Sequence, residues 1–200
     1  MQGLVVAAPG ATSQTSLSDQ GAATIEVRGS KGVGRPGELR VKHILYNRLA
    51  RDHRVCRKDG AKDHDGEDDL LCIDDRSYVV QIVTALSGGR IGLDQASTGT
   101  ANTSTSLGQI ARWIAETIRA KVLKTDPPNT VLALDANLLG VLANEALVDT
   151  YRRTVGSRPS FGFAAIWMVG PTVERCLRLD NAASVERSAA APQLKPECSA

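Results

Sequence analysis

The chain has 200 residues and a formal net charge of +2, which suits one domain with a buried core and is too little charge to indicate nucleic-acid binding by itself. Hydrophobic residues make up 42% and charged residues 23%, close to the average of soluble globular proteins. No segment approaches the roughly 20 apolar residues that cross a bilayer. We therefore expect a soluble protein without a membrane partner.

Four cysteines, Cys56, Cys72, Cys176 and Cys198, are scattered along the chain without a CxxC pair. The first residues, MQGLVVAAPGATSQTS, lack a basic leader and a long apolar run. We therefore expect a cytoplasmic protein whose cysteines are reduced. A zinc site built from cysteine and histidine is an alternative that no ligand spacing supports.

The first third of the chain predicts one strand and one helix. Residues 1–22 are rich in Ala, Ser, Thr, Gln and Gly, a composition that buries little apolar surface and predicts a disordered tail. ATIEVR (23–28) predicts a short strand, and the glycine-rich segment 29–37 lacks the order of a phosphate-binding loop. Residues 38–53 predict a helix, because Leu39, Ile44 or Leu45, and Leu49 recur at helical spacing after Pro36.

The remaining elements alternate between strands and helices. A charged loop covers 54–67, two strands with a tight turn cover 69–74 and 77–85, and 87–106 has the composition of a flexible loop. An amphipathic helix is predicted at 106–123, a buried strand at 130–136, a helix at 139–155, a strand at 163–170 and a short helix or strand at 171–179. Residues 181–200 predict a second disordered tail, which leaves 23–180 as a single α/β domain.

This order predicts an α/β fold, in which helices flank a mixed central sheet that contains an antiparallel hairpin. The order helix, hairpin, helix, strand over residues 38–136 resembles the core of the PD-(D/E)XK, or restriction-endonuclease-like, superfamily, whose αβ sandwich we therefore expect. In that family an acid begins one strand, and an acid and a lysine lie two residues apart on the next. Residues i and i+2 of a strand share a face, so these groups meet at one divalent ion, which activates water against a phosphodiester.

The resemblance implies a site in the hairpin. Asp69 takes the place of the first acid, with Asp68 as the alternative, and Gln81 takes the place of the second. Val83 stands where the family has lysine, and Glu38 resembles an additional acid that some members carry on the first helix. The implied catalytic residues are thus Asp69 and Gln81, and Asp69, Gln81 and Glu38 are the implied ligands of Mg²⁺.

Two functions stay open on this basis. One is a nuclease-like domain that hydrolyses DNA phosphodiesters with a divalent metal, at a site that is weakened or lost because Gln81 carries no charge and Val83 carries no amine. The alternative is a non-catalytic α/β interaction module that acts with a protein partner in a larger complex. Whether the chain is an enzyme is therefore left undecided.

Basic residues recur at steps of three along the first predicted helix and its extension. Arg48, Arg51 and Arg54 belong to the basic segment RLARDHRVCRK, and we expect these arginines to contact DNA phosphates if DNA is a partner. A solvated helix face is the competing interpretation.

Asp135 ends the most apolar predicted strand, at the edge where open α/β sheets commonly bind ligands. One hypothesis is therefore a doubly wound, all-parallel domain that binds a small ligand at Asp135 and Gly170. The alternative is that Asp135 stabilises the turn or helix start that follows the strand.

Overall fold

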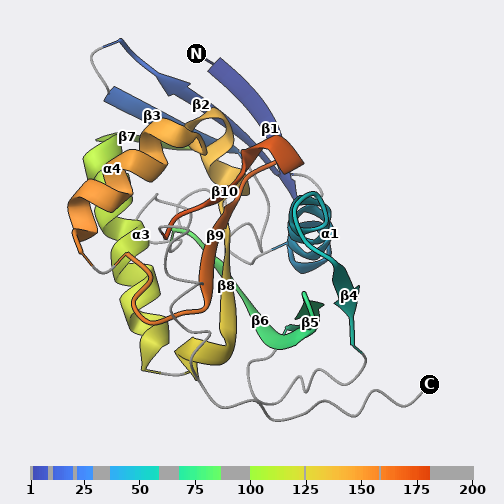
Figure 1. Cartoon of the computed structure of the whole chain (residues 1–200). Helices are drawn as coiled ribbons and strands as arrows, with labels where there is room; N and C mark the ends of the chain where they lie inside the picture. The colour runs from blue at the N-terminus through green and yellow to red at the C-terminus, as the bar shows by residue number, and fades with distance from the viewer. Residues whose placement is uncertain are drawn as a thin grey trace.

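The computed structural model describes residues 2–8, 11–19, 22–28, 37–58, 68–86, 100–123, 125–157 and 159–180. Within these ranges the chain forms a four-stranded antiparallel sheet, ordered β1-β2-β3-β7, and a six-stranded mixed sheet, ordered β10-β9-β8-β6-β5-β4, with helices packed around them (Figure 1). The α/β fold with an antiparallel hairpin in a mixed sheet is confirmed. The described residues include no helix of the length and hydropathy needed to span a bilayer.

Three of the four strands of the antiparallel sheet are formed by segments in which we expected little structure. Its strands are β1 (Gln2–Ala8), β2 (Ala11–Leu17), β3 (Ala22–Arg28) and β7 (Thr100–Ser106). Only β3 matches a predicted strand, and the disordered tail predicted for 1–22 and the loop predicted for 87–106 are corrected by β1, β2 and β7. The strands β1, β2 and β3 pair with their neighbours along the chain, and β7 pairs with the distant β3, so their backbone hydrogen bonds are satisfied although their apolar content is low.

The mixed sheet contains the predicted hairpin. Its strands are β4 (Val55–Arg57), β5 (Asp69–Ile73), β6 (Arg76–Thr84), β8 (Thr130–Asp135), β9 (Ala165–Val169) and β10 (Cys176–Arg178). The strands β6, β8 and β9 are parallel, whereas β4, β5 and β10 pair antiparallel with their neighbours. The short β4 lies in the predicted charged loop and was missed.

Capping residues and a glycine set the bounds of several helices. They are α1 (Glu38–Leu49), α3 (Leu107–Val122) and α4 (Glu145–Val155), with 3₁₀ turns η2 (Pro127–Asn129), η3 (Asn137–Leu142) and η4 (Val173–Arg175). Ser106 and Asn144 cap α3 and α4 by accepting a hydrogen bond from a first-turn N–H. The helix predicted for 139–155 is divided, because Gly140 has a φ of 50° that a helix cannot continue through.

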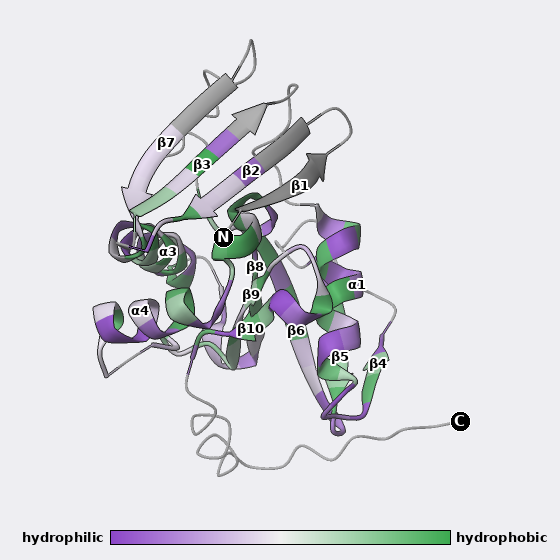
Figure 2. Cartoon of the chain, turned by 90° about the horizontal axis from the view of Figure 1, so that it is seen from above, coloured by the Kyte–Doolittle hydropathy of each residue, from purple (hydrophilic) through white to green (hydrophobic). Residues whose placement is uncertain are grey.

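Helices cover both faces of the mixed sheet. Figures 1 and 2 show α1 on one face and α3 with α4 on the other. Val41 and Leu45 of α1 are buried in the cluster that contains Val80, whereas Ile114 of α3 packs in the cluster that contains Val83. Leu39, which we expected in the buried stripe of α1, is 84% exposed. The small sheet packs on η3, beyond the end of β8, where Thr15 Oγ1 accepts a hydrogen bond from the Val141 N–H at 3.1 Å.

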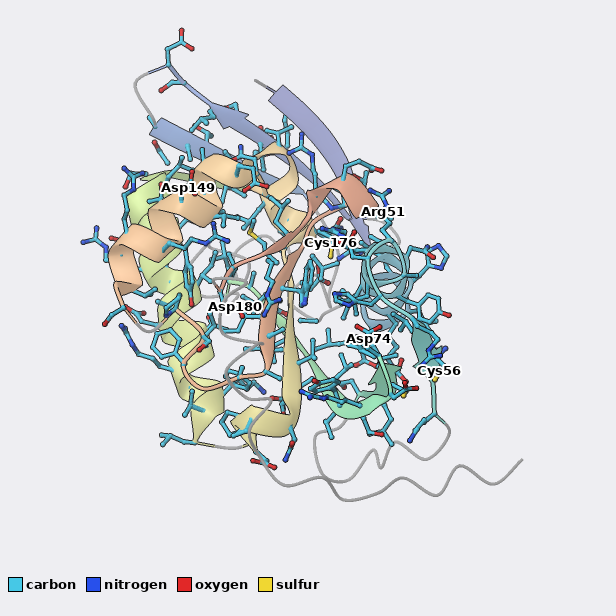
Figure 3. All side chains as sticks on the ribbon, in the orientation of Figure 1. Arg51, Cys56, Asp74, Asp149, Cys176 and Asp180 are labelled. Atoms are coloured by element: carbon cyan, nitrogen blue, oxygen red, sulfur yellow. The ribbon has the colours of Figure 1, made fainter. Side chains whose placement is uncertain are left out.

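The last described residue of the chain, Asp180, carries a buried carboxylate. Asp180 is fully buried, and Figure 3 places it beside β9 and β10. Its side chain accepts hydrogen bonds from the Ile166 N–H at 3.0 Å and from Arg178 Nη2 at 2.8 Å. The tail predicted for 181–200 lies outside the described residues.

Candidate functional site

The hairpin directs the two predicted catalytic side chains to opposite faces of the mixed sheet. Asp69 pairs with Val80 in the β5–β6 register, and directly opposed residues of a strand pair share a face. Val80 packs in the cluster with α1, so Asp69 faces α1. Gln81 is the next residue of β6 and therefore faces α3, as does Val83. The structure does not bring Asp69 and Gln81 together.

The acids at the start of the hairpin bind groups of the chain itself. Asp69 is buried, and its carboxylate forms an ion pair with Arg57 Nη2 at 3.1 Å and accepts a hydrogen bond from the Leu70 N–H at 3.0 Å. Asp68, the alternative first acid, accepts a hydrogen bond from the Ile82 N–H. That bond ends the pairing of β5 with β6, because it satisfies a backbone donor for which β5 supplies no further carbonyl.

Glu38 and Gln81 complete the predicted ligand set of Mg²⁺ but lie elsewhere. Glu38 is exposed in the first turn of α1, and α1 begins beside Asp135. Asp69 lies at the level of Val80 and Val131 in the sheet register, four residues or roughly 13 Å of strand before Asp135. Among the described residues, no group of three or more His, Cys, Asp or Glu side chains is placed to hold a metal ion. Gln81 is buried, and its Oε1 has no hydrogen-bond partner among the described residues.

Asp135 is the most highly connected of the candidate residues. Its Oδ2 accepts a hydrogen bond from the Gly37 N–H at 2.6 Å, its Oδ1 accepts one from the Asn137 N–H at 3.0 Å, and it forms an ion pair with Arg40. Arg40 also donates to the Gly170 carbonyl at 2.7 Å. The start of α1 thus covers the carboxyl ends of β8 and β9, which agrees with a structural role for Asp135.

The small-ligand hypothesis required two features, of which one is present. Asp135 and Gly170 lie near each other, because β8 and β9 are adjacent and Arg40 bridges the two residues. The hypothesis also required an all-parallel sheet, whereas β5 and β6 form an antiparallel hairpin. This arrangement disfavours the doubly wound fold.

The arginines predicted to contact phosphates are each paired with an acid. Arg48 binds Asp52 at 2.5 Å and lies over the Trp167 ring, 5.5 Å from its centroid. The two other pairs are Arg51 with Glu174, at 3.0 Å, and Arg54 with Asp75. The positive charge of this row is therefore offset within the chain, as the solvated-face interpretation expects.

A cavity of about 340 Å³ lies under the end of α1, beside the hairpin turn and the first residues of β8 and β9. Its floor is apolar and includes Leu49, Val131, Ala165 and Trp167. Its rim is polar and includes His53, Asp74, Arg76 and Arg178. This combination of an apolar floor and a few polar groups is typical of a binding site.

Two rim residues of the cavity are held by hydrogen bonds. Asp74 binds His53 Nδ1 at 2.6 Å and accepts a hydrogen bond from the Arg54 N–H at 2.9 Å. The Arg54 N–H, followed by the His53 side chain, lowers the pKa of the Asp74 carboxyl below its usual range. Sequence reasoning missed this cavity, because its residues come from separate elements that share no motif or spacing.

Comparisons of the chain with protein-family models, with curated proteins and with solved structures give no match. The function is therefore inferred from the geometry of these residues.

Proposed function

We propose that this chain is a non-catalytic α/β interaction module built on a nuclease-like core. The order α1, β5–β6 hairpin, α3, β8 supports the core, since it is the order of helix, hairpin, helix and strand on which the resemblance rests. The packing of α1 and α3 on opposite faces of one mixed sheet also supports it. The chain lacks the charged side chains that the resemblance implies at Gln81 and Val83.

The opposite orientation of Asp69 and Gln81 carries the proposal that the module is non-catalytic. A hard divalent ion binds oxygen ligands at about 2.0–2.6 Å, so its ligands must converge on one point. Side chains that leave opposite faces of a sheet cannot do so. Moreover, the Asp69 carboxylate already has a cation beside it, the Arg57 guanidinium, which takes the place that a metal would occupy electrostatically.

Metal binding and DNA cleavage test this part of the proposal. We expect calorimetric titration with Mg²⁺ or Mn²⁺ to give the same weak heats for the natural chain and for Asp69→Ala, and plasmid DNA to stay intact with both. Asp69→Asn is the matched control, because it keeps the shape of the side chain and removes its charge. Tight metal binding or nicking that depends on Asp69 would restore the nuclease hypothesis.

The cavity under α1 is the surface on which we place the interaction. Its apolar floor fits an aromatic or aliphatic group, and Arg76 is exposed at the rim between the turn and β6. The chemistry that fits both features is an apolar side chain next to an acidic group in the partner protein. Trp167 lines the cavity, and because the chain has a second tryptophan, Trp113, the fluorescence of Trp167 is read in a chain with Trp113→Phe, where it reports on occupancy.

An aromatic anion is a simple probe of this cavity. We expect 8-anilinonaphthalene-1-sulfonate to bind the folded chain and to change the Trp167 emission, and we expect Arg76→Glu to weaken binding several-fold, because it replaces attraction by repulsion. Arg112→Glu is the matched control, since Arg112 is exposed on α3 and lies outside the cavity lining. Equal affinities of the two variants would show that the probe does not bind in the cavity.

A further inference from the structure

Two cysteines face each other across the edge of the mixed sheet. Cys56 of β4 pairs directly with Cys72 of β5. Two residues away on either side, the Lys58 N–H donates to the Leu70 carbonyl and the Asp74 N–H donates to the Arg54 carbonyl. The alternation of an antiparallel ladder makes Cys56 and Cys72 a hydrogen-bonded pair, with Cα atoms about 5.5 Å apart. Disulfides span roughly 4.4–6.8 Å between Cα atoms, a range that includes the spacing of this pair.

The two thiols differ in accessibility and are in contact. Cys56 is exposed and Cys72 is partly buried, and Figure 3 shows Cys56 at the outer edge of the molecule on β4. Burial and a hydrogen bond to Cys56 raise the pKa of the Cys72 thiol. Cys56 is thus the thiol that a reagent in solution meets first, with Cys72 beside it as a proton donor.

Cys176 provides an internal contrast. It is buried, and Figure 3 places it between the inner strands and α1, far from the outer edge on which Cys56 lies. Burial raises the pKa of its thiol to about 12. Thiols of this kind are unreactive, because the thiolate is the nucleophile.

A lysine lies on the same face as the cysteine pair. Lys58 is two residues beyond Cys56 in the chain, and its Nζ donates to Ser77 Oγ at 2.8 Å. Ser77 is the residue of β6 directly opposite Cys72. The ammonium group therefore lies close to Cys72, and its positive charge partly opposes the burial that raises the pKa of the Cys72 thiol.

We propose that Cys56 and Cys72 form a reversible disulfide that joins β4 to β5, with a low-molecular-weight disulfide such as glutathione disulfide as the oxidant. The Cys56 thiolate attacks one sulfur of the oxidant, a mixed disulfide forms, and the first glutathione leaves as a thiolate. The Cys72 thiolate then attacks Cys56 Sγ and displaces the second glutathione. Two electrons pass from the protein thiols to the oxidant, and the two protons are taken up by the glutathione thiolates.

The disulfide would add a covalent link between the edge strand and its neighbour. β4 has three residues and pairs only with β5 within the described sheet. A bond at the exposed edge is also open to reducing thiols, so the link is reversible. This modification site does not depend on the proposed interaction at the cavity.

The experiment uses the full chain with Cys198→Ser, which leaves Cys56, Cys72 and the buried Cys176. After reduction and removal of the reductant, the folded protein is titrated with mixtures of reduced and oxidised glutathione. We expect its mass to fall by two hydrogen atoms, peptide mapping to join Cys56 to Cys72, and dithiothreitol to reverse the change. We also expect the midpoint of thermal unfolding to rise by about 5 °C, because the link constrains the unfolded chain.

Two outcomes separate a disulfide from independent modification. With Cys72→Ser added, we expect one stable glutathione adduct on Cys56 and no rise in the unfolding midpoint, because the second thiol is missing. The mass, the peptide map and the unfolding midpoint of the chain with Cys198→Ser test the proposal even if the variant with Cys72→Ser does not fold. Stable adducts on both Cys56 and Cys72 in that chain, or a link from either to Cys176, would overturn the proposal.

Discussion

Asp69, Asp68 and Asp135 are carboxylates whose hydrogen bonds hold the chain together. Asp69 pairs with Arg57, Asp68 binds the Ile82 N–H, and Asp135 binds the start of α1. Asp69 and Asp135 are buried, and a buried carboxylate is costly without such partners, so their hydrogen bonds and ion pairs are required for stability. An acid at a strand end is therefore weak evidence of catalysis until its partners are known.

Tyr151 gives a prediction at the same scale. It is fully buried, and its hydroxyl donates to the Pro159 carbonyl at 2.7 Å. Burial, aided by Asp180, raises the pKa of this phenol above its usual value of about 10. The folded state holds the proton more tightly, so the stabilisation is complete below about pH 10 and is lost as the pH rises further. We expect the free energy of unfolding to fall above about pH 10, and an ultraviolet titration to show Tyr151 protonated until the chain unfolds.

The variant Tyr151→Phe isolates this effect from other groups that titrate at high pH. It should be less stable than the natural chain by about 1 kcal/mol at neutral pH, the usual worth of a hydrogen bond, and its alkaline loss of stability should be smaller. Tyr78→Phe, at a half-buried position, serves as the control. Equal alkaline slopes for the natural chain and Tyr151→Phe would show that Tyr151 does not contribute.

The turn of the β5–β6 hairpin fixes the register in which its two strands pair. Asp74 and Asp75 have φ values of 48° and 69°, the positive angles that a two-residue hairpin turn of type I′ requires. This turn sets the register in which Asp69 pairs with Val80, and a slip by one residue would reverse every side chain of the strand. The turn residues therefore decide which face the predicted catalytic acid occupies.

The second turn residue provides a stability test. We expect Asp75→Gly to raise the free energy of unfolding by about 0.5 kcal/mol, because glycine adopts a positive φ without steric cost. The change removes the ion pair with Arg54, but both side chains are 74% exposed, and such pairs contribute little. Asp75→Ala is the matched control, which loses the same ion pair without the backbone relief and should lower stability. Urea unfolding measures both, and a loss of stability in Asp75→Gly would show that the ion pair dominates.

At the scale of the whole molecule, the layers are joined by contacts between distant segments. The Arg40–Asp135 pair and the Gly170 carbonyl connect α1, β8 and β9. Thr15 binds the backbone of η3 and so attaches the four-stranded sheet to the end of β8. None of these contacts follows a local pattern, which is why the sequence left the role of Asp135 open. The strands β1 and β2 pair locally but were predicted as a tail because their composition is low in apolar residues.

Local signals were sufficient for much of the fold. The amphipathic stripe of α3, the apolar runs of β8 and β9 and the tight turn of the hairpin each reflect neighbours in the sequence, and the corresponding helix and strands are confirmed. The helix predicted for 38–53 ended earlier, at Leu49. The short β4 gave no signal, because three residues show no periodicity.

The sequence by itself determined the α/β class, the hairpin, and the presence of Gln81 and Val83 where the resemblance implies charged groups. Only the tertiary structure decided that Asp69 and Gln81 face opposite sides, that Arg57 neutralises Asp69, and that Cys56 meets Cys72. The physical reason is that secondary structure depends mainly on neighbours along the chain, whereas the pairing of side chains depends on strand register and packing between segments far apart in sequence.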